Sequence, residues 1–167
     1  MICLTQTRTG FPAGNCTETS MACILELPVE VLPPLWSRKT GRSEATWCRL
    51  HTALRDLGYV LVWADIELQH TPVRFNELWP WHPAAAFPEW RSFHLLGGPN
   101  PDELSHCVVG YNGEMFWDPN PRRRGIVAVD GIGALVPIDR VRQMRSLFPE
   151  VETCYGIQLR IGGPGDV

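Results

Sequence analysis

The sequence predicts an α+β fold in which N-terminal helices pack on an antiparallel β-sheet. Two segments with helical features come first, within residues 16–57, and a series of short, branched or aromatic segments of strand type follows from residue 59. Helices that precede a run of strands are typical of a layered α+β domain. The chain has 167 residues, the length of one domain, so we expect residues 1–167 to form a single domain.

The first predicted helix covers residues 16–27. Asn15 is the predicted N-cap, and Glu18, three residues later, is the acid expected to complete a capping box. Pro28 cannot continue a helix, so it marks the end.

The second predicted helix covers residues 43–57. Ser43 is the predicted cap and Gly58 the stop signal. Apolar residues recur along it at helical spacing, so we expect it to cover the sheet: Trp47, Leu50, Leu54 and Leu57.

The rest of the chain has strand character interrupted by turn residues. Strands are predicted at residues 59–63, 92–96, 105–110, 114–118, 126–129, 134–138 and 155–161, and a short helix at 139–147. Residues 64–90, rich in Pro, Trp and His, are too long for a plain connection, and we expect a functional excursion there.

Composition argues against several classes of protein. The net charge of −3 disfavours nucleic-acid binding, which usually needs a clustered basic surface, and Arg122-Arg123-Arg124 is the single basic cluster. No apolar stretch approaches the roughly 18 to 20 residues that span a bilayer. We therefore expect a soluble, cytoplasmic protein that binds neither nucleic acid nor membranes.

The six cysteines are expected to be reduced thiols, because no secretion signal opens the chain. They form no Cys-x-x-Cys pair, and the histidines lack the spacing of metal ligands. We therefore expect no metal site and no cofactor.

Three residues far apart in the sequence form a candidate catalytic set. Cys16 lies at the predicted start of the first helix, His106 opens a strand, and Asp118 ends the next strand. Unpaired amides and the dipole at a helix start favour a thiolate. An imidazole can hold that thiolate as an ion pair while an acid orients the ring. The order predicts a thiol nucleophile with its base and orienter, and Asn120 is the alternative orienter.

The turn between the two strands decides whether His106 and Asp118 can meet. A two-residue loop would turn them to opposite faces of the sheet. A three-residue loop over residues 111–113, with Gly113 left-handed, would pair Gly110 with Glu114 and set His106 directly across from Asp118. The catalytic interpretation therefore predicts the three-residue loop.

Several short stretches around these residues also carry a resemblance: Thr5-Gln6-Thr7, Gly14-Asn15-Cys16, Leu25-Glu26-Leu27-Pro28, His106-Cys107-Val108-Val109-Gly110, Asn112-Gly113 and Asp118-Pro119. Together they resemble a group of small phage and bacterial papain-like proteins and, more distantly, the bacteriocin-processing double-glycine peptidases. The likeness spans roughly residues 5–125.

The resemblance implies a papain-like cysteine protease fold with Cys16 as nucleophile, His106 as base and Asp118 as orienter. It also implies a glutamine before the cysteine that completes an oxyanion hole, and Gln6 is the candidate. Gln6 precedes Cys16 by ten residues, more than in the peptidases, so residues 7–14 have to absorb the extra length.

We expect the protein to hydrolyse a peptide, isopeptide or related amide bond of a protein or peptide substrate through an acyl-thioester on Cys16. The same triad can deliver the acyl group to an amine, so a glutamine deamidase or transglutaminase-type acyl transferase is the enzymatic alternative. A non-catalytic, phage-encoded interaction protein on the same fold is the alternative from another class, because fold alone does not fix function. The oligomeric state is not predicted.

Overall fold

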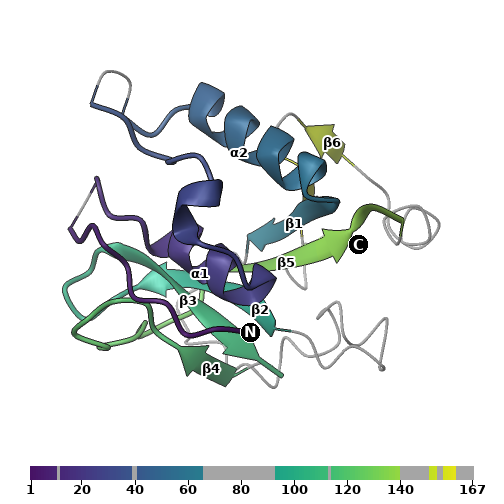
Figure 1. Ribbon diagram of the computed structural model, residues 1–167. Helices are drawn as coiled ribbons and strands as arrows, with labels where there is room; N and C mark the ends of the chain where they lie inside the picture. Colours follow the sequence, from purple (N-terminus) through teal and green to yellow (C-terminus); the bar gives the residue numbers. More distant parts are fainter. Residues whose placement is uncertain are drawn as a thin grey trace.

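The computed structural model describes residues 1–10, 12–38, 41–65, 93–112, 114–139, 151–153 and 156–160. Within these residues the fold is α+β, as predicted, with two α-helices on a β-sheet (Figure 1). The expectations for the excursion over residues 66–90, for Gly113 and for helix residues 140–147 lie outside the described residues.

Both predicted helices are present. Helix α1 spans Cys16–Leu25 and ends in a left-handed Glu26 (φ 58°), slightly before the predicted end at Leu27. A short 3₁₀ helix, η1, covers Val29–Val31. Helix α2 spans Glu44–Asp56 and has Ser43 as its N-cap residue. The Thr46 hydroxyl accepts a hydrogen bond from the Ser43 N–H (3.0 Å), which fixes the cap residue against the first turn of the helix. Neither helix is long and apolar enough to cross a membrane, and no other helix within the described residues is.

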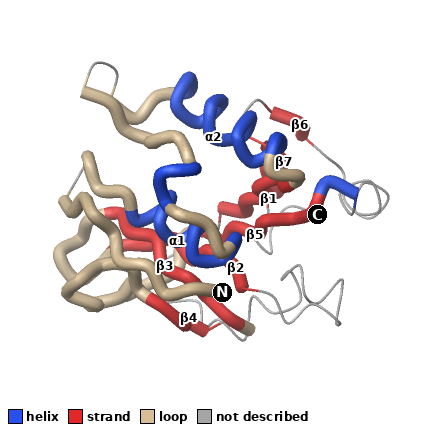
Figure 2. The backbone as a smooth tube through the Cα atoms, in the orientation of Figure 1, coloured by secondary structure: helices blue, strands red, loops and turns tan. Residues whose placement is uncertain are grey.

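The described strands form one sheet: β1 (Tyr59–Asp65), β2 (Phe93–Pro99), β3 (Ser105–Tyr111), β4 (Glu114–Trp117), β5 (Gly131–Pro137), β6 (Val151–Thr153) and β7 (Gly156–Arg160). Their order is β4-β3-β2-β5-β1-β7-β6 (Figure 2). The predicted antiparallel pairing holds from β4 to β1, but β7 joins β1 in parallel, so the sheet is mixed.

The strand predicted over residues 126–129 is wrong. This segment bends and is tied to the end of β2 by the Val127 N–H, which donates to the Pro99 carbonyl (2.8 Å). It lies so close to β2 that a Cβ on Gly98 would stand 1.9 Å from the Ala128 oxygen. The branched residues there look like a strand, yet the Val127 side chain is exposed and the segment packs across β2 instead of pairing along it.

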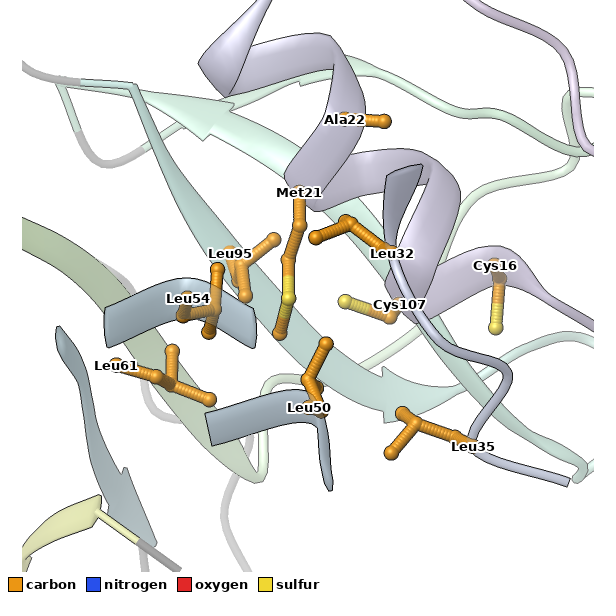
Figure 3. Packing of buried hydrophobic residues seen from close by; sticks show 10 residues of the cluster. All are labelled: Cys16, Met21, Ala22, Leu32, Leu35, Leu50, Leu54, Leu61, Leu95 and Cys107. Atoms are coloured by element: carbon orange, nitrogen blue, oxygen red, sulfur yellow. The ribbon is translucent and has the colours of Figure 1, made fainter. Parts of the chain in front are cut away.

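The main core lies where both helices meet one face of the sheet. Figure 3 shows Met21 of α1 reaching toward Leu50 and Leu54 of α2, with Leu95 of β2 beside it. Cys16 belongs to the same cluster, so the start of α1 is anchored at the edge of the core. Burying these apolar side chains contributes about 1.5 to 3 kcal/mol each.

Glycines on the sheet make room for one aromatic ring. The indole of Trp63 lies over three of them, so that a Cβ on Gly131 would stand 2.5 Å from Trp63 Cζ2 and one on Gly133 would stand 2.5 Å from Cε3. A third, Gly97, would bring a Cβ to 3.1 Å from the same ring. The small residues are therefore required by packing against Trp63 and not by backbone conformation.

We predict that Gly131→Ala lowers the free energy of unfolding by about 1 to 3 kcal/mol, because the new methyl group overlaps the Trp63 ring. Urea unfolding measures the loss. In a Trp63→Leu background the same substitution should cost clearly less, since the overlapping ring is gone. An equal cost in both backgrounds would contradict this packing.

Candidate active site

Residues 6–15 form a loop that brings Gln6 toward the start of α1. The Arg8 N–H donates to Asn15 Oδ1 (3.0 Å), and the Asn15 N–H donates to the Arg8 carbonyl (3.2 Å). The described residues between this pair, 9–10 and 12–14, form no helix or strand. The loop thereby absorbs the long separation between Gln6 and Cys16, as the sequence required.

The capping box predicted at Asn15 and Glu18 is wrong. Asn15 uses its side chain on Arg8 and makes no side-chain cap. Glu18 is buried, accepts a hydrogen bond from the Leu35 N–H (2.9 Å) and lies 3.6 Å from the Arg8 guanidinium. Both side chains tie neighbouring segments to the first turn of α1, where a carboxylate also suits the positive end of the helix dipole.

The N-terminal segment runs between α1 and β4 and holds Gln6 in place (Figure 1). The Leu4 N–H donates to the sulfur of Cys23 on α1 (3.2 Å), and the Trp117 indole donates to the Leu4 carbonyl (2.8 Å). The Gln6 N–H then donates to the Pro119 carbonyl (2.9 Å). Gln6 is thus fixed between the helix start and the residues that follow β4. Cys23 is buried.

His106 and Asp118 meet, but not through the predicted turn. Tyr111 pairs with Glu114 and Gly110 with Met115, as a two-residue hairpin loop gives, so the expected pair of Gly110 with Glu114 is wrong. Asn112 has a left-handed backbone in this turn (φ 50°).

A β-bulge in β4 places Asp118 on the same face of the sheet as His106, which the two-residue turn alone would not do. Between Met115 and Trp117, the extra residue Phe116 shifts the register, so Trp117 pairs with Val109. If Phe116 instead paired regularly with Val109, Trp117 would face Val108, and Asp118 would point to the face opposite His106. The expectation of His106 directly across from Asp118 is therefore corrected to a diagonal pair on the same face.

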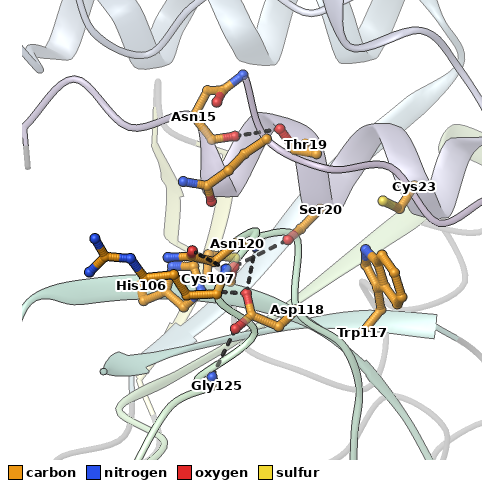
Figure 4. A network of polar contacts seen from close by, with 12 residues as sticks. Asn15, Thr19, Ser20, Cys23, His106, Cys107, Trp117, Asp118, Asn120 and Gly125 are labelled. Carbon is orange, nitrogen blue, oxygen red and sulfur yellow. Dashed lines mark hydrogen bonds and ion pairs between the residues drawn. The ribbon is translucent and has the colours of Figure 1, made fainter. Parts of the chain in front are cut away.

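The Asp118 carboxylate binds three hydrogen-bond donors (Figure 4). Its Oδ1 lies 2.7 Å from His106 Nε2 and accepts the Asn120 N–H at 2.8 Å, while Oδ2 accepts the Gly125 N–H at 2.8 Å. Burial acts to raise the pKa of Asp118, but the hydrogen bond with His106 and the two amide bonds outweigh it and lower the pKa. Asp118 is therefore an ionised partner of His106, and Asn120 shapes the turn.

Cys16 and His106 form the second half of the set. Asp118 engages Nε2 of the ring, which leaves Nδ1 for the thiol. Burial acts to raise the pKa of Cys16, but hydrogen bonding to His106 and its charge hold the pKa below the ordinary value, helped by the Cys107 amide and by Arg42. Burial acts to lower the pKa of His106, but Asp118 and Cys16 raise it to about 9. The two groups therefore favour a thiolate and an imidazolium at neutral pH.

Cys16 differs from the other buried thiols. Burial raises the pKa of Cys23, and burial together with the charge of Cys16 raises the pKa of Cys107 well above its ordinary value. Cys3, Cys16, Cys23, Cys48 and Cys107 are all free thiols; Cys154 lies outside the described residues.

A small cavity of about 50 Å³ opens onto the sulfur. Cys16, His106, Gln6 and Arg42 all line it. The Gln6 side-chain amide is buried and gives one N–H to the Arg8 carbonyl (3.0 Å), so its second N–H is available to a ligand. Arg42 was missed by sequence reasoning, because it lies before α2 with no local pattern that points to the site.

The described residues include no group of three or more His, Cys, Asp or Glu side chains arranged to hold a metal ion. Comparisons of the chain with models of protein families, with curated proteins and with solved structures found no match. The candidate site is therefore described by its own residues and geometry.

We predict that iodoacetamide alkylates Cys16 faster than the other thiols below pH 7, because His106 keeps Cys16 in its reactive thiolate form. His106→Ala should move the midpoint of the rate against pH upward, since the cation that lowers the pKa of Cys16 is gone. Peptide mapping by mass spectrometry at a series of pH values measures both effects. Labelling of Cys16 no faster than that of Cys3 or Cys48 would contradict the assignment.

We predict that deleting Phe116 leaves the pKa of His106 raised, near 9, because Trp117 keeps its partner Val109 and Asp118 stays on the face of His106 in a ladder without the extra residue. Titration of the His106 ring by NMR measures it. Deleting Met115 together with Phe116 is the contrasting variant: it moves Asp118 by one ladder position, to the opposite face of the sheet, so the pKa of His106 should fall. A pKa that falls equally in both variants would show that the register of the ladder does not set the face of Asp118.

Proposed function

We propose that the protein is a cysteine hydrolase with a papain-like arrangement that cleaves a peptide, isopeptide or related amide bond. The observation that carries the proposal is the set Cys16, His106 and Asp118, in which one buried imidazole interacts with a thiol and an ionised carboxylate. A lone structural cysteine has no need of a low pKa, whereas a nucleophile does.

The mechanism follows from the protonation states. The Cys16 thiolate attacks the carbonyl carbon of the scissile bond and forms a tetrahedral oxyanion, which collapses to an acyl-thioester as the amine leaves. His106 gives its proton to that amine and later takes a proton from the water that hydrolyses the thioester. Asp118 keeps the imidazole oriented and stabilises its charge throughout.

The oxyanion needs donors beside Cys16. Amides in the first turn of α1 lack acceptors within the helix, and Gln6, which lines the same cavity, has a second side-chain N–H that the Arg8 carbonyl does not use. A donor of this kind typically contributes about 3 to 4 kcal/mol to the transition state. Gln6 is therefore the proposed side-chain half of the oxyanion hole.

A direct test uses peptide and ubiquitin-like probes with electrophilic ends, followed by intact-mass measurement, and a mixed peptide library for turnover. The expected result is one adduct, located on Cys16, and cleavage of library peptides. Probe binding without any cleavage would favour the non-catalytic interaction protein instead.

We predict that Cys16→Ser abolishes library cleavage but changes the free energy of unfolding by less than about 1 kcal/mol, because the substitution is nearly isosteric. Gln6→Ala should lower the cleavage rate by about 10²- to 10³-fold. Cys3→Ser, at an exposed thiol, is the control and should retain full activity. Wild-type rates in Gln6→Ala would remove Gln6 from the oxyanion hole.

A further inference from the structure

A second, larger cavity adjoins the site on the side of the base. It encloses about 330 Å³ and is lined by His106 and Asp118 but not by Cys16. It shares His106 and Asn120 with the cavity lined by Cys16, so the two cavities are neighbours. The leaving amine must lie within reach of the group that protonates it, which is His106. The larger cavity is therefore the place for the leaving half of the substrate.

The turn that follows Asp118 forms one wall of this cavity and carries three successive arginines with three different environments. Arg123 stacks on the Trp117 ring, 4.3 Å from its centroid. Arg124 forms an ion pair with Asp102, at 2.7 and 2.8 Å to the two carboxylate oxygens. Arg122 lines the cavity, and within the described part of the chain its side chain has neither an ion-pair nor a hydrogen-bond partner.

Arg122 is held in place by its main chain. Its N–H donates to Asn120 Oδ1 (3.0 Å), and the turn is closed by the bonds from the Asn120 and Gly125 amides to Asp118. The same carboxylate that orients His106 therefore fixes the backbone of Arg122. A preorganised backbone reduces the entropy lost when the side chain binds a ligand.

The local charge differs in sign from that of the whole protein. The chain carries a net charge of −3, yet the charged groups on the walls of the larger cavity include an ion pair, Arg124 with Asp102, and a second pair, His106 with Asp118. Among the described residues that line the cavity, Arg122 is the cation without a paired carboxylate. A guanidinium binds carboxylates through paired, charge-assisted hydrogen bonds.

We propose that Arg122 selects substrates whose leaving fragment carries a carboxylate close to the scissile bond, either an acidic side chain or a terminal carboxylate. This inference rests on the proposed hydrolase function and names the substrate class of the same site. Arg122 is a specificity-determining residue in it, and the chemistry is left to Cys16 and His106.

The test runs the leaving step in reverse. A panel of N-acetyl amino acid thioesters acylates Cys16 with release of a small thiol, and an added amine then competes with water for the acyl-enzyme. The amine nitrogen attacks the thioester carbon, the C–N bond forms as the C–S bond breaks, sulfur leaves as thiolate, and the amine proton passes to neutral His106. The amine must occupy the cavity of the leaving fragment, so the ratio of amide to acid product reports binding there.

Two matched pairs of amines separate the two sources of a carboxylate. Glutamate amide is compared with glutamine amide for a side chain, and glycylglycine with glycylglycine amide for a terminus. We expect the acid of at least one pair to be favoured by about five- to tenfold, with a smaller preference at high salt, because Arg122 is exposed. Arg122→Gln should bring the ratio to about one. Arg123→Gln, which removes the same charge from the stacked neighbour, should keep it.

The outcomes are distinguishable. If no thioester acylates Cys16, the proposed hydrolase function fails, and this inference fails with it. If Cys16 is acylated but both pairs of amines react equally, the inference alone is overturned. A preference lost equally in Arg122→Gln and Arg123→Gln would also overturn it, because the effect would then come from net charge and not from Arg122.

Discussion

The buried carboxylate of Asp118 is the group on which the rest of the site depends. It accepts hydrogen bonds from a side chain, His106, and from two main-chain amides, those of Asn120 and Gly125. An ionised carboxylate out of water is costly unless its oxygens are satisfied, and these three donors satisfy it. One charge therefore orients the imidazole and closes the turn on which Arg122 lies. Substitution of Asp118 would be expected to alter both, so effects at this position are not purely catalytic.

The junction between α1 and β3 brings the nucleophile to that carboxylate. The Ser20 hydroxyl of α1 donates to the Cys107 carbonyl of β3 (3.3 Å), and the Cys107 amide helps to hold the Cys16 thiolate. The His106 imidazolium lies between two anions, the Asp118 carboxylate and the Cys16 thiolate, so each group stabilises the charged form of its neighbour. The raised pKa of His106 and the lowered pKa of Cys16 are two consequences of the same contact, and they belong to the pair.

The loops around the site act as its scaffold. Glu18, Asn15 and Arg8 link the first turn of α1 to two segments that carry no secondary structure of their own. Gln6 is held by the chain that follows Asp118, so the proposed oxyanion donor and the orienting acid are tied to one another through Pro119. Asn15 and Glu18 look like helix-capping residues in the sequence, but their side chains instead accept hydrogen bonds from the amides of Arg8 and Leu35, outside the helix.

Local sequence patterns determined the helices, most of the strands and the three residues of the candidate triad. Helix α2 could be predicted because its signals depend only on neighbours along the chain and need no knowledge of the fold. These signals are the cap Ser43, the stop Gly58 and the apolar spacing of residues 47–57. Only the tertiary structure decided the register. Phe116 looks like an ordinary strand residue, yet it forms a bulge. Side chains alternate between the two faces along a strand, so this one-residue shift in register decides whether Asp118 lies on the same face as His106. The partners of Asn15 and Glu18 and the position of Arg42 beside the sulfur were likewise set by segments distant in sequence, and no spacing along the chain encodes them.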